Sequence, residues 1–235
     1  MFHDAFNFNQ PLNKWNVSNE TDMRNMFSYA EKFNQPLEKW NVSNVKNMYR
    51  MFISAKNFNQ SLNKWDVSNV ENMHDMFYNC TKFNGDISEW NTENVIDMSY
   101  MFYNCKSFNQ NINTKYVIDT EKDIWVQGND WSLIKTIKKI RKYLSWNTEN
   151  VKNMSNMLNG AENFNQDVRN WDVSKETNET HETKFQDIFS NTNMDDKYFK
   201  YMKNRTITDE NKYYFFKYIF EKKENEKIND IVNEY

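Results

Sequence analysis

Residues 40–60 read WNVSNVKNMYRMFISAKNFNQ, and close copies of this phrase recur along the chain every 25 residues. Tryptophan marks the interval, at Trp15, Trp40, Trp65 and Trp90 and again at Trp146 and Trp171. A fixed period of this size indicates stacked structural units, each of which touches mainly its two neighbours. We therefore expect equivalent side chains of successive repeats to lie above one another in one continuous apolar column.

The second half of the repeat predicts a short helix. Met48, Met51, Phe52 and Ala55 stand at i, i+3, i+4 and i+7, which is one face of an amphipathic helix. Asn47 precedes this segment, where an Asn or Asp side chain accepts a hydrogen bond from a free helical N–H. The same position holds only Asn or Asp in the other repeats, at Asp22, Asn72, Asp97 and Asn153.

The first half of the repeat predicts a short strand, because Leu37-x-x-Trp40-x-Val42 puts Trp and Val at i and i+2 on one side. Asn lies at the bends between the elements, in two columns: Asn34, Asn59, Asn84, Asn109 and Asn44, Asn69, Asn94, Asn150. We interpret these columns as ladders that satisfy buried backbone groups, with a row of ligand-binding amides as the alternative. The resulting fold class is α/β, a solenoid with short parallel strands on one wall and short helices on the other.

Composition excludes several classes of protein. The net charge of −3 gives no bulk attraction to nucleic acid or to an acidic membrane, and with 3 Gly and 2 Pro the chain is not a linker. No segment approaches the roughly 18 apolar residues of a membrane span. The N-terminus has no basic region followed by an apolar stretch, so no signal peptide is visible as written. Met1-Phe2-x-x-Ala5 matches the middle of a repeat, so the chain begins in mid-repeat.

The period breaks once inside the array and fades near its end. After Trp90 the next Trp of the array, Trp146, arrives 56 residues later, which is one repeat of 25 plus an insertion of 31. We expect four regions: repeats at 1–115, the insertion at 116–144, further and degenerate repeats at 145–193, and a helical C-terminal cap at 194–235. Within the insertion, residues 131–144 predict a basic amphipathic helix. It either packs on the solenoid or docks to an acidic partner or membrane surface.

The phrase F-N-Q-x-L-x-x-W-x-V-S-N-V-x-N-M-x-x-M-F-x-x-A/C, present from Phe8 to Ala30 and in the three following repeats, resembles the BspA-like leucine-rich-repeat surface proteins. The resemblance is closest to the mycoplasma-type surface lipoprotein repeat of unknown function, and it covers about 1–115 and 145–175. It implies a right-handed β/α solenoid of LRR-like repeats, surface display, and protein–protein or host-cell attachment. Similar repeats occur in large DNA viruses and protists, and the lipoprotein signal with its Cys is missing here. The location is therefore open between the cell surface and, if Met1 is the true start, an intracellular or viral setting.

No catalytic, metal or cofactor site is predicted. The three His residues lie far apart in the sequence, and no phosphate-binding or nucleophile-elbow motif is present. Cys80 and Cys105 replace the Ala of two consecutive repeats, and we interpret them as buried thiols, with a disulfide as the alternative.

The predicted function is that of a non-enzymatic scaffold for protein–protein interaction or attachment. A partner is expected at surface columns that vary between repeats and carry Tyr, Arg or His, at Tyr49, Arg50, His74, Tyr78, Tyr100 and Tyr103. The alternative is a structural or self-assembling component without a foreign ligand. It would associate through the open first repeat, where Phe8, Trp15, Val17 and an unpaired strand are expected to be exposed.

Overall fold

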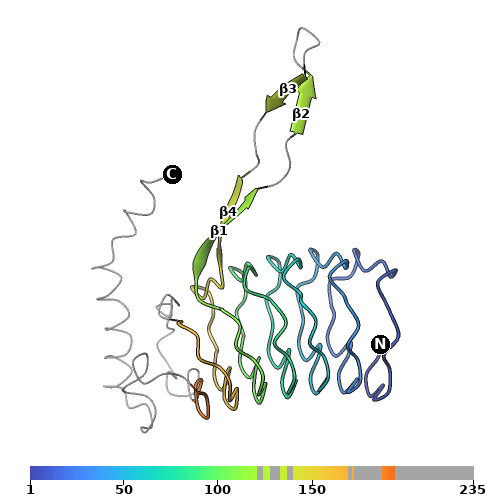
Figure 1. The fold of residues 1–235 in the computed structure, drawn as a ribbon, viewed down its shortest axis with the longest axis vertical. Coiled ribbons are helices and arrows are strands. Elements are labelled where there is room, and N and C mark those ends of the chain that lie inside the picture. The colour runs from blue at the N-terminus through green and yellow to red at the C-terminus, as the bar shows by residue number, and fades with distance from the viewer. Residues whose placement is uncertain (121–123, 128–132, 137–139, 169–170, 172–186, 194–235) are drawn as a thin grey trace, which may run out of the picture.

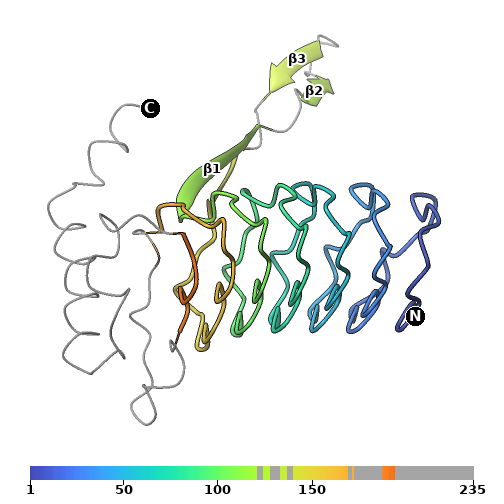
Figure 2. The ribbon, with the colours of Figure 1, turned by 60° about the horizontal axis from the view of Figure 1, so that its bottom comes forward.

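The computed structural model describes residues 1–120, 124–127, 133–136, 140–168, 171 and 187–193. In this part of the chain successive repeats lie side by side in one row (Figures 1 and 2). One residue of each repeat forms a parallel bridge with the same residue of the next, through Asp22, Asn47, Asn72, Asp97 and Asn153. We propose from this stacking that the fold class is a solenoid.

Residues 49–54 form consecutive turns, so the helix predicted there is wrong. The backbone N–H groups of residues 48, 50, 52 and 54 donate across the stack, at 2.7–3.0 Å, to the carbonyl oxygens of Asn72, His74, Met76 and Tyr78. An α-helix needs every N–H for its own i−4 carbonyl and a negative φ, whereas φ is 54° at Arg50 and 56° at Ser54. The turns still bury Met48, Met51, Phe52 and Ala55, the four side chains of the predicted helical face.

Residues 37–42, predicted as a strand, contain a turn at 38–39 and no ladder to the neighbouring repeat. Trp40 and Val42 nevertheless face the core, with 3% and 1% of their surface exposed. The indole Nε1–H of Trp40 donates to the carbonyl of Leu12 at 3.0 Å, and Trp65 repeats the bond to Leu37 at 2.9 Å. The side chains are therefore placed as predicted, but indole hydrogen bonds rather than a β-ladder connect this segment to the previous repeat.

A column of stacked phenylalanines forms the centre of the core. Within one repeat the rings of Phe52 and Phe58 lie 4.2 Å apart, and Phe52 stacks on Phe77 of the next repeat at 5.5 Å. All three rings are fully buried. This arrangement confirms the prediction that equivalent aromatic side chains pile up along the repeats.

The Asn columns form the predicted ladders. The side-chain oxygen of Asn34 accepts the backbone N–H of Asn59 at 2.9 Å, and Asn59 does the same for Asn84 at 2.7 Å. In the second column the amide of Asn69 donates to the carbonyl of Ser43 at 2.7 Å. These amides pair with backbone groups at the bends, as the sequence indicated, but the bonds lie at the exposed surface, so the prediction that they satisfy buried groups is wrong here.

The described residues of the insertion and its borders form four strands: β1 (Lys115–Thr120), β2 (Ile124–Gln127), β3 (Leu133–Thr136) and β4 (Ile140–Ser145). The strands β1 and β4 pair antiparallel, as do β2 and β3, and Figure 1 shows this ribbon leaving the row of repeats. The basic helix predicted at 131–144 is therefore wrong for residues 133–136 and 140–144, which are strands. Isoleucines spaced three residues apart fit one face of a helix. Residues 133–136 and 140–145 also fit strands, and each run has a partner strand in the first half of the insertion: β3 pairs with β2, and β4 pairs with β1.

The hairpin leaves the stack without disturbing the repeat on either side. Trp146 follows β4 and takes the place of the next Trp of the array. Its ring stacks on Trp90 at 6.2 Å, and its backbone N–H donates to the carbonyl of Trp90 at 2.9 Å. The hydroxyl of Thr114, just before β1, donates to the carbonyl of Trp146 at 2.7 Å. The two ends of the insertion therefore meet, and the array continues in register.

The first repeat leaves part of its aromatic core exposed, and hydrogen bonds between repeats continue to residues 188 and 190. At the first repeat 42% of Trp15 is exposed and Phe8 is partly buried, whereas Val17, also expected at the surface, is buried in the core. Near the other end, Leu158 and Gly160 donate to the carbonyls of Ile188 and Ser190, as equivalent residues do between earlier repeats. The predicted cap at 194–235 lies outside the described residues. Within those residues, no helix has the length and apolarity of a membrane span.

Candidate interaction surface

The six residues expected to bind a partner come together on consecutive turns of the stack. We call them the aromatic patch: Tyr49, Arg50, His74, Tyr78, Tyr100 and Tyr103. The rings of Tyr49 and His74 stack at 5.4 Å, and Tyr78 stacks on Tyr103 at 4.7 Å. Tyr100 joins the two pairs, 6.0 Å from His74 and 5.7 Å from Tyr103. All six side chains are partly buried, so the patch is a packed surface and not a set of free side chains.

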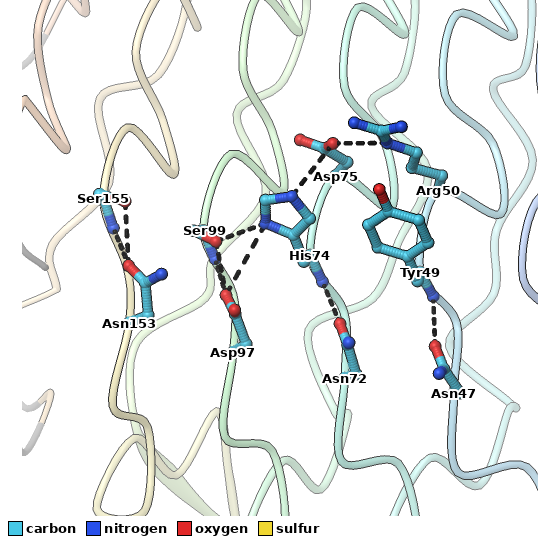
Figure 3. A network of polar contacts seen from close by, with 10 residues as sticks. All are labelled: Asn47, Tyr49, Arg50, Asn72, His74, Asp75, Asp97, Ser99, Asn153 and Ser155. Atoms are coloured by element: carbon cyan, nitrogen blue, oxygen red, sulfur yellow. Dashed lines mark hydrogen bonds and ion pairs between the residues drawn. The ribbon is translucent and has the colours of Figure 1, made fainter.

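His74 is at the centre of a polar network with Asp75, Ser99 and Asp97 (Figure 3). Its Nε2 lies 3.2 Å from a carboxylate oxygen of Asp75, and its Nδ1 lies 2.5 Å from the hydroxyl oxygen of Ser99. The Ser99 hydroxyl donates its own proton to Asp97 at 2.5 Å, so it accepts from His74. Both ring nitrogens therefore face acceptors, which favours the doubly protonated, cationic imidazole.

Asp75 is shared between two cations. Arg50 Nε donates to the same carboxylate oxygen at 2.8 Å, and only 7% of the Asp75 side chain is exposed. The hydrogen bond that His74 donates to Asp75 raises the pKa of His74 above its ordinary value, against the opposing effect of burial. Burial alone would raise the pKa of Asp75, but the bonds from His74 and Arg50 outweigh it and lower that pKa.

These shifts predict a pH window for stability. Because the pKa of His74 in the folded protein lies above 6.5, protonated His74 stabilises the folded state. This stabilisation is fully present below pH 6.5 and is lost as the pH rises through the folded-state pKa. Because the pKa of Asp75 in the folded protein lies below 3.8, the Asp75 carboxylate also stabilises the folded state. This stabilisation is present above pH 3.8 and is lost as the pH falls through the folded-state pKa. The free energy of unfolding of the wild type should therefore exceed that of His74→Gln most clearly between pH 3.8 and 6.5.

Denaturant unfolding of the two proteins across the pH range measures this difference. The variant Asp75→Asn should lose the same window, because it removes the negative charge that His74 and Arg50 share. A difference between wild type and His74→Gln that stays constant with pH would contradict the assignment.

Three residues of this network were not identified from the sequence as part of the site: Asp75, Asp97 and Ser99. Asp97 belongs to the Asn/Asp column that was expected to cap a helix, and here the column closes a turn: the Asp97 oxygen accepts the N–H of Ser99 at 2.8 Å. Asp75 is in the same column as Arg50, one repeat further along the chain. The ion pair between Arg50 and Asp75 could have been predicted from the sequence, because opposite charges stand 25 residues apart in the same column.

The network contains Ser, His and Asp but is not arranged for nucleophilic catalysis. Ser99 donates its proton to Asp97, and only 1% of the residue is exposed. The His74 nitrogen that faces Ser99 acts as a donor, so it does not accept a proton from the hydroxyl. Among the residues that the structure describes, no cluster of His, Cys, Asp and Glu is suited to hold a metal ion.

Cys80 and Cys105 are free and fully buried, as interpreted from the sequence. Their thiols donate to the carbonyls of Phe52 and Phe77, at 2.8 and 2.9 Å. Burial raises the pKa of both thiols well above the ordinary value. They are therefore small core residues and not reactive nucleophiles.

No curated protein and no solved structure matches the chain. One family model does match, that of a Mycoplasma protein of unknown function, DUF285, over residues 1–82, 37–125 and 132–227. These segments together span most of the sequence, and they include the repeats that carry the aromatic patch. The chain therefore belongs to this Mycoplasma-type repeat family of unknown function.

Proposed function

We propose that the protein is a non-enzymatic repeat scaffold that binds a protein partner through the aromatic patch. The observation that carries the proposal is the convergence of the six variable residues on adjacent turns, over a frame whose core residues repeat. The finer likeness to BspA-like leucine-rich-repeat surface proteins favours attachment as the biological role.

Two physical features support binding of a protein. Tyr, Arg and His supply large contact areas with polar ends, and Tyr and Arg are enriched among the residues that dominate interface energies. The side chains are also held in place before any partner arrives, by ring stacking and by the buried Asp75 carboxylate. Such preorganisation reduces the entropy lost on association.

A non-enzymatic role is part of the same proposal. The His74 network uses its protons internally, because both ring nitrogens and the Ser99 hydroxyl face acceptors within the protein. No member of the network is left as a free general base or an activated nucleophile. The network instead holds the side chains of Arg50, Tyr49 and Tyr100 in one orientation.

The proposal is tested with a patch variant and a matched surface variant. The patch variant carries Tyr49→Ala, Tyr78→Ala and Tyr103→Ala, and the control carries alanine at three exposed positions before the core Trp, namely Lys39, Lys64 and Glu89. Affinity capture with the intact chain identifies a partner, and its dissociation constant is then measured with purified proteins. We expect the patch variant to bind about 30-fold or more weakly, since truncating an interface anchor costs about 2 kcal/mol.

The control variant should bind like the wild type. Equal losses in both variants would contradict the assignment of the patch, and capture of nothing foreign would contradict the proposed function. Recovery of more copies of the same chain would favour the self-assembling alternative.

A further inference from the structure

Two arginines on neighbouring repeats are held in different ways. Arg24 pairs with a carboxylate of its own repeat. Its Nε lies 3.0 and 2.8 Å from the two oxygens of Asp22, and its Nη2 lies 2.7 Å from one of them. Arg50 engages Asp75 through Nε alone, at 2.8 Å. Among the described residues, the terminal nitrogens of Arg50 form no hydrogen bond, so its outer edge is open.

The open guanidinium of Arg50 is fixed from two sides. Asp75 holds Nε from within the protein, and the ring of Tyr49 lies 4.8 Å from the guanidinium carbon. The backbone of Arg50 is in the left-handed region, with φ of 54°, an uncommon conformation for a bulky residue. With 43% of its side chain exposed, Arg50 presents a positioned pair of terminal NH₂ groups to solvent.

At this edge the exposed group is a cation, and the carboxylate that pairs with it is buried. His74, whose two ring nitrogens face Asp75 and Ser99, stacks on Tyr49, whereas Asp75 has only 7% of its side chain exposed. Asp97 is the other carboxylate of the network and lies beyond His74, at 3.9 Å from Nδ1. An approaching anion therefore meets the donors of Arg50 first, with the negative charge of Asp75 beneath them.

We propose that Arg50 is the anchor of the aromatic patch for a carboxylate, supplied by an acidic segment of the protein partner. The planar guanidinium offers two parallel N–H donors that match the two oxygens of a carboxylate. The tyrosines beside it supply apolar contacts for the rest of a peptide chain, which a free inorganic anion would not use. This inference rests on the proposed function and adds the chemistry of the partner.

The test uses two peptide probes, hexaglutamate and hexaglutamine, titrated into the isotopically labelled full-length protein. Binding is followed by NMR, through the backbone amides of residues 49–54 and 74–79. The variant Arg50→Lys keeps a cation beside Asp75 but loses the paired donors, and Arg24→Lys is the matched control. We expect hexaglutamate to bind saturably and hexaglutamine not to bind. Arg50→Lys should weaken hexaglutamate binding about fivefold, as for one half-exposed ion pair, and Arg24→Lys should leave it unchanged.

Equal effects of the two lysine variants, or equal binding of the two peptides, would overturn the inference. Tighter binding of inorganic phosphate than of hexaglutamate would also overturn it, by assigning the site to a phosphoryl group. If the tyrosine patch variant loses the captured partner while Arg50→Lys retains it, the inference fails and the proposed function stands. If hexaglutamate binds at Arg50 as expected but no foreign protein is captured, the proposed function fails and the carboxylate site stands.

Discussion

Replacing Phe77 with alanine should lower the free energy of unfolding by about 3–5 kcal/mol. The Phe77 ring is fully buried and stacks on Phe83 of its own repeat at 4.1 Å. It also stacks on Phe52 and Phe102 of the two neighbouring repeats, at 5.5 and 5.7 Å. The variant therefore loses contacts in three repeats and leaves a cavity in the middle of the aromatic column, where the stack cannot easily close.

Urea or guanidinium unfolding, monitored by tryptophan fluorescence, measures this loss. Phe77→Leu should cost less than Phe77→Ala because it fills part of the cavity. Lys82→Ala, an exposed position of the same repeat, should change stability by less than about 0.5 kcal/mol. A loss below about 1 kcal/mol for Phe77→Ala would show that the column does not carry the stability of the stack.

Gly85→Ala is the second large effect, with an expected loss of about 3 kcal/mol. A Cβ at this position would lie 2.1 Å from the carbonyl oxygen of Gln60 and 2.7 Å from its carbonyl carbon. Both atoms belong to the backbone of the neighbouring repeat, so no side-chain rotation relieves the contact. One of the two repeats must move, and the inter-repeat hydrogen bonds beside it must change.

Gly160→Asn is the matched control for Gly85→Ala. Gly160 has a positive φ of 76°, but the same column holds Ser54, Asn79 and Asn104 at φ of 55–58°. A Cβ at Gly160 would approach Asn104 no closer than 3.3 Å. The control should therefore cost about 1 kcal/mol or less. Thermal unfolding of the two variants measures the loss of stability in each. Equal losses would contradict the inference that the close contact between Gly85 and the Gln60 backbone causes the effect.

The gap between prediction and structure is clearest at residues 48–55. The apolar spacing correctly identified which side chains are buried, because a tight series of turns and an α-helix both bring residues i, i+3 and i+4 to one side. The spacing does not say where the backbone N–H groups find acceptors. Here alternate groups bond to the next repeat, and an isolated copy of the segment contains no such acceptor.

The aromatic patch was accessible from the sequence for the same reason as the core. A fixed period puts Tyr49 and His74 in one column, and their rings do stack. The ion pair of Arg50 with Asp75 and the hydroxyl bridge through Ser99 depend on side-chain directions that the period does not encode. The insertion shows the same limit: its length followed from the Trp spacing, but its conformation depended on pairing between β1 and β4.

The sequence alone therefore determined the period, the columns of the core, the Asn ladders and the place of the insertion. Each of these follows from which residue type recurs at which interval, because equivalent residues of stacked repeats must meet. Only the tertiary structure decided between helix and turn, between helix and hairpin, and which charges pair beneath the patch. Those outcomes depend on hydrogen-bond partners in other repeats or strands, and the local sequence does not contain them.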